Sequence, residues 1–396
     1  MKPTAIKKDF WWVGAIDWDL RDFHGYETEK GSTYNAYLVK GNNKVALFDT
    51  VKAEHTDTLI SNIKQIIEPD RIDYIISNHS EMDHTGALPE ILKIVKPEKL
   101  LCSRKGAETL QLHFHRDDWP LEIVDKETVL DLGGKTVQFV ASPMLHWPES
   151  MVSYIPEDAV LISNDIFGQH YASSERFDDE VDQGELHRQA AKYYANIFLP
   201  VSSGMGKFLD KLENQKLKLD FLAVDHGLIW RKDIDGIIEK YRFWSSQKTV
   251  PKAVIVYDTM WGSTAKMARA IADGLIGNGV SIMVFDLHHN HRSDIITEAL
   301  DARAIILGSS VLNKNILPKM ADFVTYMKGL SPANKIGAAF ASYGWNDVAT
   351  KQLNEIMEGL KFEIVDSGVA AKYVPSEDDL NKCRELGKNI RKAILA

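Results

Sequence analysis

The stretch Asn78-His79-Ser80-Glu81-Met82-Asp83-His84 contains four potential metal ligands within six residues. It follows a strand-like apolar run at 72–76 and precedes a helix-like run that begins near residue 85. A chain that leaves a strand can turn back, so these four side chains can face one point. Imidazole and carboxylate ligands without a thiolate favour harder ions such as iron or manganese.

Three further potential ligands each follow a strand-like run later in the chain. His146 comes after 137–140, Asp165 after 160–163 and His226 after 221–224. Binding residues commonly lie on loops that a rigid sheet holds in place, so four strand ends can bring their ligands together. Four His, two Asp and one Glu make seven ligands, enough for two ions if one carboxylate bridges them. We predict that Asp165 is the bridge, because it stands alone between the other ligand groups.

Each of the three later residues also has a simpler interpretation when taken alone. A His at a strand end is more often a hydrogen-bonded structural residue, and an Asp there more often forms a turn or caps a helix. The dense cluster at 79–84 favours the metal interpretation, because it supplies the partners that an isolated ligand lacks.

The ligand pattern and its flanking sequence resemble the flavodiiron proteins. In that family a Glu replaces one His of the metallo-β-lactamase pattern, as Glu81 does here. The similarity extends to the C-terminus and includes the segments DWDLRDFHG at 17–25, TYNAYL at 33–38, LHWPESM at 145–151 and SNDIFGQ at 163–169. The resemblance implies that His24 and Tyr194 line the di-iron pocket. The iron ligands that it implies are His79, Glu81, Asp83, His84, His146, Asp165 and His226.

Length and composition limit the number of domains and the kinds of partner that are expected. A chain of 396 residues exceeds one ordinary core, so two domains are expected. The net charge of -9 argues against nucleic acid as a partner, because phosphate binding needs clustered Lys and Arg. No apolar run approaches the roughly 20 residues of a membrane span, and the N-terminal sequence lacks the apolar core of a secretory signal.

Cysteine usage limits the redox centres that the chain can hold. Only Cys102 and Cys383 are present, whereas an iron–sulfur or rubredoxin-type centre needs four thiolates. Any such electron carrier must therefore be a separate protein. Scarce cysteine suits a reducing compartment, so we expect a cytoplasmic protein.

The first part of the chain mixes strand and helix signals. Strands are predicted at 10–15, 34–39 and 44–49, and helical periodicity follows over 55–67. A helix at 237–246 ends before Pro251, which disfavours helix at the residue before it. We therefore assign residues 1–249 and 250–396 to two domains. The resemblance implies that the first is an α+β metallo-β-lactamase-like αββα sandwich.

The second part alternates strand and helix regularly. A strand at 253–257 leads into the loop DTMWGST at 258–264 and then a helix over 265–276. Loop N–H groups, hydroxyls and the positive end of a helix form an anion site. The loop has neither a Walker lysine nor Gly-x-Gly-x-x-Gly, which favours a mononucleotide over a triphosphate or a dinucleotide. The pattern resembles an α/β flavodoxin-like doubly wound parallel sheet, which binds FMN.

Three loops at the carboxyl ends of the predicted strands are expected to hold the FMN. The sequence at 309–311 departs from the usual Ser/Gly-Pro-Thr, and Asn346-Asp347 replaces a Ser-Gly-Gly-like turn. We expect these changes to affect flavin affinity and potential more than flavin identity. Tyr343 and Trp345 are expected to stack on the isoalloxazine ring or to shield it. The predicted FMN-binding residues are Thr259, Met260, Trp261, Gly262, Ser263, Thr264, Ser309, Ser310, Val311, Asn313, Asn315, Ser342, Tyr343, Gly344 and Trp345.

A His-rich patch at His288, His289 and His291 follows the second strand of this part. In flavodoxin terms it lies away from the cofactor loops. We interpret it as a solvated surface.

Metal and flavin together match the electron count of a gas reductase. Reduction of O2 to water takes four electrons, and reduction of two NO to N2O takes two. A ferrous pair can supply one electron per iron and reduced FMN two more. The resemblance implies reduction of O2, NO or both, with rubredoxin or reduced deazaflavin F420 as electron donor. It also implies a head-to-tail homodimer, or a dimer of dimers, that joins the FMN of one chain to the di-iron site of the other.

Two other classes of protein remain open. One is a dizinc hydrolase of the metallo-β-lactamase superfamily fused to a flavodoxin domain, and Glu81 argues against it because dizinc members usually have His there. The other is an electron carrier whose first domain has lost its metal, and the complete ligand set argues against that.

Overall fold

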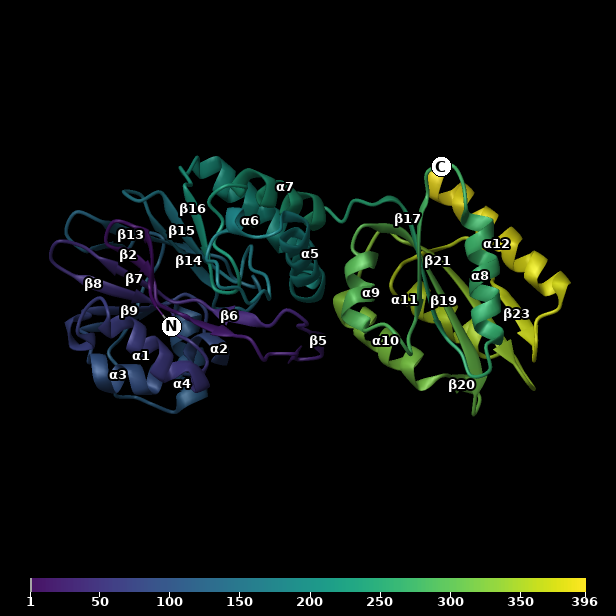
Figure 1. Ribbon diagram of the computed structural model, residues 1–396, viewed down its shortest axis with the longest axis horizontal. Helices are drawn as coiled ribbons and strands as arrows, with labels where there is room; N and C mark the ends of the chain where they lie inside the picture. The colour runs from purple at the N-terminus through teal and green to yellow at the C-terminus, as the bar shows by residue number, and fades with distance from the viewer. Residues whose placement is uncertain (1) are drawn as a thin grey trace. The chain divides into compact units, whose positions relative to one another are not determined.

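The computed structural model describes residues 2–396, which form two compact units (Figure 1). The first unit contains the stretch ending at His24, Thr28–Tyr193 and Ser203–Arg242. The second contains Gly25–Glu27, Tyr194–Ser202 and Phe243–Ala396. The chain passes from the first unit to the second mainly at 242–243, a few residues before the domain boundary predicted at 249–250. The two short excursions, 25–27 and 194–202, were not predicted from the sequence.

A mixed seven-stranded sheet forms one half of the first unit. The pairing of its strands is antiparallel at one end of the sheet and parallel at the other. The parallel part brings the carboxyl ends of neighbouring strands to one edge, where the stretch 78–84 leaves the sheet. In spatial order the strands are β1 (Thr4–Lys7), β2 (Phe10–Trp12), β7 (Tyr37–Lys40), β8 (Val45–Phe48), β9 (Tyr74–Ser77), β10 (Lys99–Cys102) and β11 (Leu121–Ile123).

A five-stranded sheet forms the other half. In spatial order its strands are β12 (Val129–Asp131), β13 (Thr136–Ala141), β14 (Met151–Ile155), β15 (Val160–Asn164) and β16 (Phe221–Val224). The last two strands are parallel, so their carboxyl ends also lie at one edge of the sheet.

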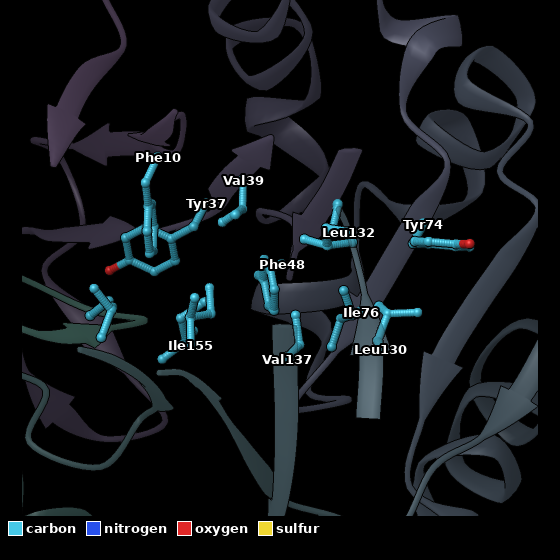
Figure 2. Packing of buried hydrophobic residues seen from close by; sticks show 14 of the residues in the cluster. Phe10, Tyr37, Val39, Phe48, Tyr74, Ile76, Leu130, Leu132, Val137 and Ile155 are labelled. Carbon is cyan, nitrogen blue, oxygen red and sulfur yellow. The ribbon is translucent and has the colours of Figure 1, made fainter. Parts of the chain in front are cut away.

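The two sheets pack face to face around a shared apolar core. Figure 2 shows Phe10, Tyr37 and Phe48 of the first sheet close to Val137 and Ile155 of the second, and all five are buried. Buried and exposed residues alternate along the start of β13, as expected for a strand with one face in a core. This core fixes the two edges that carry the predicted metal ligands.

Helices cover the outer faces. Apolar residues of α1 (Thr56–Lys64), α3 (Leu88–Val95) and α4 (Arg104–Phe114) form a second core against the first sheet. On the other side, Tyr241 of α7 (Ile234–Ser245) packs on Phe167, which follows β15, with ring centroids 4.7 Å apart. The first unit is therefore the helix–sheet–sheet–helix sandwich that the resemblance implied.

The second unit is built on a parallel sheet with the spatial order β18 (Ser281–Asp286), β17 (Val250–Asp258), β19 (Ala302–Leu312), β21 (Ile336–Tyr343) and β22 (Glu363–Ile364). β23 (Val369–Lys372) also pairs with β21, and β20 (Asn315–Ile316) forms a hairpin with β19. Figure 1 shows α9 (Arg292–Ala299) and α10 (Pro318–Leu330) on one side of the strands and α8 (Ser263–Leu275) and α12 (Glu377–Leu395) on the other. This is the predicted doubly wound sheet, which binds ligands at the carboxyl ends of its strands.

Both cysteines are free and fully buried, Cys102 in β10 and Cys383 in α12. Burial raises the pKa of each thiol to about 12. Across residues 2–396, no helix combines the length and the apolar character needed to cross a bilayer.

Candidate metal centre and flavin pocket

Loops at the ends of four strands carry the seven predicted metal ligands. The Asp49 carboxylate fixes the first loop where it leaves β9, because it accepts hydrogen bonds from the backbone and side-chain nitrogens of Asn78 at 2.7 and 2.8 Å. The one-turn helix α2 (Met82–Thr85) then begins earlier than the sequence indicated and carries Asp83 and His84. The other ligands follow β13, β15 and β16. The predicted ligand atoms gather in two groups, each within 4.8 Å. The first group is His79, Glu81, His146 and Asp165, and the second is Asp83, His84 and His226. A further group of the same size joins His84 and Asp165 to Asp225, which was not predicted.

Asp165 lies between the two groups and faces both. Its Oδ2 lies 3.0 Å from His146 Nε2 and 3.5 Å from His79 Nε2. Its Oδ1 lies 3.3 Å from His84 Nε2 and 3.5 Å from His226 Nε2. One carboxylate oxygen thus serves each group, which is the arrangement that a bridging ligand requires.

Several buried ligand atoms lack hydrogen bonds. His84 Nε2 lies 3.4 Å from Asp83 Oδ1, yet within residues 2–396 both His84 ring nitrogens, both Asp83 oxygens and Asp165 Oδ1 have no hydrogen-bond partner. Burial opposes protonation of His84, but Asp83 and Asp165 raise its pKa to about 10. Buried polar atoms without partners are costly, and these belong to groups whose ligand atoms lie within 4.8 Å of one another. The donor set therefore fits metal ions, and imidazole with carboxylate suits iron.

Outer partners fix two of the imidazoles. Glu149 Oε1 lies 2.9 Å from His79 Nδ1, and the Thr33 carbonyl oxygen lies 2.6 Å from His226 Nδ1. Each Nδ1 donates to its partner, which leaves Nε2 to face the metal. Burial opposes protonation of His79, but hydrogen bonds to Glu149 and Glu81 hold its pKa well above the usual value. Glu149 lies in the segment 145–151 that carried the resemblance, yet no role was predicted for it.

A cavity of about 680 Å³ opens onto the first metal group and is lined in part by Phe23, His24, Glu81 and Trp147. His24 Nε2 lies 3.6 Å from Glu81 Oε1, and the His24 side chain is 76% exposed. His24 therefore lines the cavity at its open end.

Tyr194 is not among the residues that line this cavity, and its placement at the metal pocket was wrong. Its hydroxyl lies 3.0 Å from Ser202 Oγ. The adjacent Tyr193 faces the site instead, with its ring centroid 6.0 Å from that of His226. Consecutive helical residues point about 100° apart, so only one of the two can face the metal. Here α5 (Gln183–Tyr193) passes into a π-helical turn at Tyr194–Phe198, a change that the sequence does not reveal.

His170 is a further buried residue at the site that was not predicted. Its Nδ1 lies 2.7 Å from Ser32 Oγ, and its ring centroid lies 4.8 Å from that of His226. Burial and the neighbouring His226 hold the pKa of His170 well below its usual value, so it is a neutral imidazole. The sequence feature that could have indicated His170 is its position, one residue after the segment 163–169 that carried the resemblance.

Glu29 anchors the segment that carries Phe23 and His24. Its carboxylate accepts hydrogen bonds from Lys192 Nζ at 2.5 Å and Gln189 Nε2 at 2.9 Å, both on α5. Burial opposes ionisation of Glu29, but these bonds outweigh it and hold its pKa below the usual value. The helix that presents Tyr193 to the metal site therefore also fixes the cavity wall.

We expect Glu29→Gln to make folding stability less sensitive to acid. The pKa of Glu29 is lower in the folded than in the unfolded state, so ionised Glu29 stabilises the fold above its unfolded pKa. That contribution is lost as the pH falls through the lower folded value. Urea unfolding midpoints between about pH 5 and pH 3 should therefore fall more steeply in wild type than in the variant. Glu90→Gln, at an exposed helix position, is the control, and equal slopes in all three proteins would contradict the prediction.

A second cavity, of about 240 Å³, lies at the carboxyl ends of β17, β19 and β21. Trp261 and Trp345 are 93% and 88% exposed, so both indole faces are available to a planar ring. The lining residues are Met260, Trp261, Ser263, Ser310, Val311, Ser342, Tyr343, Gly344, Trp345 and Tyr373. All except Tyr373 were predicted. Tyr373 was missed because it follows β23, beyond the last strand that the sequence indicated.

Hydroxyls from three elements meet beside this cavity. Thr264 Oγ1 of α8 lies 2.9 Å from Ser310 Oγ of β19 and 2.9 Å from Ser342 Oγ of β21, and the two serine oxygens lie 3.0 Å apart. The helix α8 begins after Gly262, whose φ of 82° suits glycine, and it has no side-chain cap. Its first N–H groups are therefore open to a phosphate. Hydroxyls, a helix N-terminus and exposed aromatic rings together fit FMN.

The remaining predicted flavin residues lie outside this cavity. Thr259 Oγ1 accepts from the Gly262 backbone at 3.2 Å and shapes the loop. Ser309 Oγ accepts from the Leu317 backbone at 2.9 Å. Asn313 and Asn315 are exposed on the β19–β20 hairpin.

The interpretation of His288 as distant from the cofactor loops was wrong. Its Nε2 lies 3.0 Å from Asp258 Oδ1, directly before the predicted phosphate loop. The strand β18 ends beside β17, so the two loops that follow them meet. His289 is exposed, as expected.

The chain combines a two-group metal centre with a flavin-type sheet, which defines a metalloflavoprotein. Residues 33–227 match the family described as ODP family beta lactamase, and residues 255–387 match the flavodoxin family. A nitric oxide reductase of Moorella thermoacetica is 44% identical over 98% of both chains. The solved rubredoxin oxygen:oxidoreductase of Desulfovibrio gigas is 42% identical with a TM-score of 0.97, covering 99% of this chain and 98% of its own. The flavodiiron protein of Giardia intestinalis has 30% identity and a TM-score of 0.96, covering 100% and 97%.

The chain therefore belongs to the flavodiiron protein family. Its metal centre is a di-iron site and its second unit binds FMN, which makes it an oxidoreductase.

Proposed function

We propose that this protein reduces O2 to water, NO to N2O, or both, with electrons that pass through FMN from an external donor. When bound, the ferrous pair supplies one electron per iron and the reduced flavin supplies two. Conversion of O2 to two waters consumes four electrons and four protons. Conversion of two NO to N2O and one water consumes two electrons and two protons.

The position of Asp165 is the observation that supports this function most directly. Asp165 has one carboxylate oxygen toward each ligand group and would hold one metal ion to each. Two ions held by these residues would supply the Lewis acidity and the electrons for reduction of O2 or of two NO molecules. A single-metal hydrolytic site would not need this shared ligand.

Residues around the cavity would hold and shield the substrate. Phe23 and Trp147 line the cavity beside Glu81 and would limit the entry of water there. Burial and the Asp165 carboxylate hold the pKa of Tyr193 well above its usual value, so this hydroxyl keeps its proton at neutral pH and can donate a hydrogen bond. His24 at the open end of the cavity would donate to a substrate oxygen.

We further propose an external donor and a multimeric assembly. The two cysteines are buried and cannot hold an iron–sulfur centre, so rubredoxin or reduced deazaflavin F420 would deliver the electrons. Scarce free cysteine supports a cytoplasmic setting. A head-to-tail homodimer, or a dimer of dimers, would bring the FMN of one chain to the di-iron site of another. An active monomer in size-exclusion chromatography would overturn this assembly.

Anaerobic stopped-flow mixing of the reduced protein with O2 and with NO tests the proposed reaction. We expect rapid flavin reoxidation with at least one gas, in protein that contains about two irons per chain by elemental analysis. Protein that contains zinc alone, or that reacts with neither gas, would overturn the assignment and leave a dizinc hydrolase as the alternative.

A further inference from the structure

His84 differs from His79 and His226 in how its outer ring nitrogen is held. The outer nitrogens of the other two lie 2.9 and 2.6 Å from their acceptors. His84 Nδ1 instead lies 3.7 Å from Asp225 Oδ2, beyond hydrogen-bond range. Within residues 2–396, neither His84 ring nitrogen and neither Asp225 carboxylate oxygen has a hydrogen-bond partner. The His84 Nδ1 donor and the Asp225 carboxylate acceptor therefore lie near each other without forming a hydrogen bond.

The backbone on both sides of this gap is fixed. The His84 carbonyl accepts from the Thr50 backbone nitrogen at 2.9 Å and from Thr50 Oγ1 at 2.5 Å. The Asp225 backbone donates to the Asn164 carbonyl at 2.8 Å and accepts from the Asn35 nitrogen at 2.8 Å. Small side-chain rotations are therefore enough to close the contact, and larger movements of the loops are not required.

Within residues 2–396, His84 is the one cationic side chain with a nitrogen less than 4.0 Å from the Asp225 carboxylate, and His79 acts on that carboxylate from farther away. Asp49, another buried carboxylate on which His84 acts electrostatically, already accepts hydrogen bonds from Asn78. Asp225 is fully buried, and a buried carboxylate is costly unless a donor pairs with it. An imidazole that binds a metal through one nitrogen commonly donates through the other to a carboxylate. His84 and Asp225 have the residue types and the positions for this arrangement.

We propose that Asp225 is the positioning residue of His84. Its carboxylate accepts a hydrogen bond from His84 Nδ1 and thereby turns His84 Nε2 toward Asp83 and Asp165. Asp225 thus determines whether His84 completes the second metal group with Asp83 and His226. This inference rests on the proposed function in taking the bound ions as iron, but any divalent ion at the site reports the same geometry.

Metal retention tests the inference without turnover. Diferrous wild type, Asp225→Asn and Asp220→Asn are each titrated anaerobically with a ferrous chelator, and their Mössbauer spectra are recorded. We expect Asp225→Asn to hold one of its two irons about 10- to 100-fold more weakly, the range typical of a lost outer partner, with one of the two iron signals altered. Asp220→Asn, a half-exposed position at the start of the same strand, should match wild type in both measurements.

A double-mutant cycle separates positioning through His84 from direct ligation by Asp225 or a general structural role. His84→Asn alone should weaken the same iron, and adding Asp225→Asn should cause no further loss, because the residue through which it acts is gone. Additive losses would overturn the proposal, as would retention and spectra in Asp225→Asn equal to those of wild type. If Asp225→Asn does not fold, unchanged retention in His84→Asn would overturn it independently.

Failure of the proposed function remains distinguishable from failure of this inference. Wild-type protein that carries zinc alone would refute the reductase. The zinc-loaded proteins would then be titrated with a zinc chelator, and the expected order of metal retention across the variants is unchanged.

Discussion

The Asp165→Ala variant is expected to retain little iron and to reduce O2 or NO more than about 100-fold more slowly than wild type, since loss of an outer partner alone costs up to about that factor. Asp165 places one oxygen against each ligand group. Its removal would therefore take one ligand from each ion. The two remaining groups of carboxylates and imidazoles would no longer share a ligand.

Iron per chain and the rate of gas consumption, measured with O2 and NO electrodes, check this prediction. Asp220→Ala is the matched control, because it removes a partly exposed carboxylate that pairs with Lys7. Wild-type iron content in Asp165→Ala would show that the two groups do not depend on a shared ligand.

Thr264→Val is expected to weaken FMN binding by about 10- to 100-fold. The Thr264 hydroxyl bonds to both Ser310 and Ser342 beside the open N-terminus of α8. A hydrogen bond to a charged group is worth about 1.5–3 kcal/mol, and each 1.4 kcal/mol or so is tenfold in affinity. Valine keeps the shape of the side chain, so the loss reports the hydroxyl.

Fluorescence titration of the flavin-free protein with FMN gives the dissociation constants. Thr325→Val is the control, since this exposed threonine of α10 bonds only its own helix at Ala321. Equal affinity in wild type and Thr264→Val would mean that backbone groups alone hold the phosphate.

The metal ligands could be predicted because so many metal-binding residue types rarely occur within a few positions of one another, and because each ligand segment follows a strand-like run. The residues that support them could not. Glu149 and Asp225 act on ligands 70 and 141 positions away in sequence, and no local pattern links them. Tyr194 was predicted in place of Tyr193 for a similar reason. Which residue of a helix faces the metal site depends on the helical register, and the π-helical turn that begins at Tyr194 changes that register.

The order of elements was predictable from periodicity, whereas proximity between loops was not. The flavin loops follow strands whose apolar runs are plain in the sequence, and nine of the fifteen predicted flavin residues line the second cavity. His288 was misjudged because its nearness to Asp258 depends on β18 and β17 being neighbours in the sheet. Tyr373 was missed because a short late strand, β23, carries it there.

The burial of both thiols bears on how the protein survives its own substrates. Sulfenic acid formation and S-nitrosation both proceed most readily at an accessible thiolate. With each pKa near 12 and each side chain fully enclosed, Cys102 and Cys383 present almost no thiolate to the gases at neutral pH. A catalyst that draws oxidants into its interior thus keeps both of its thiols away from them.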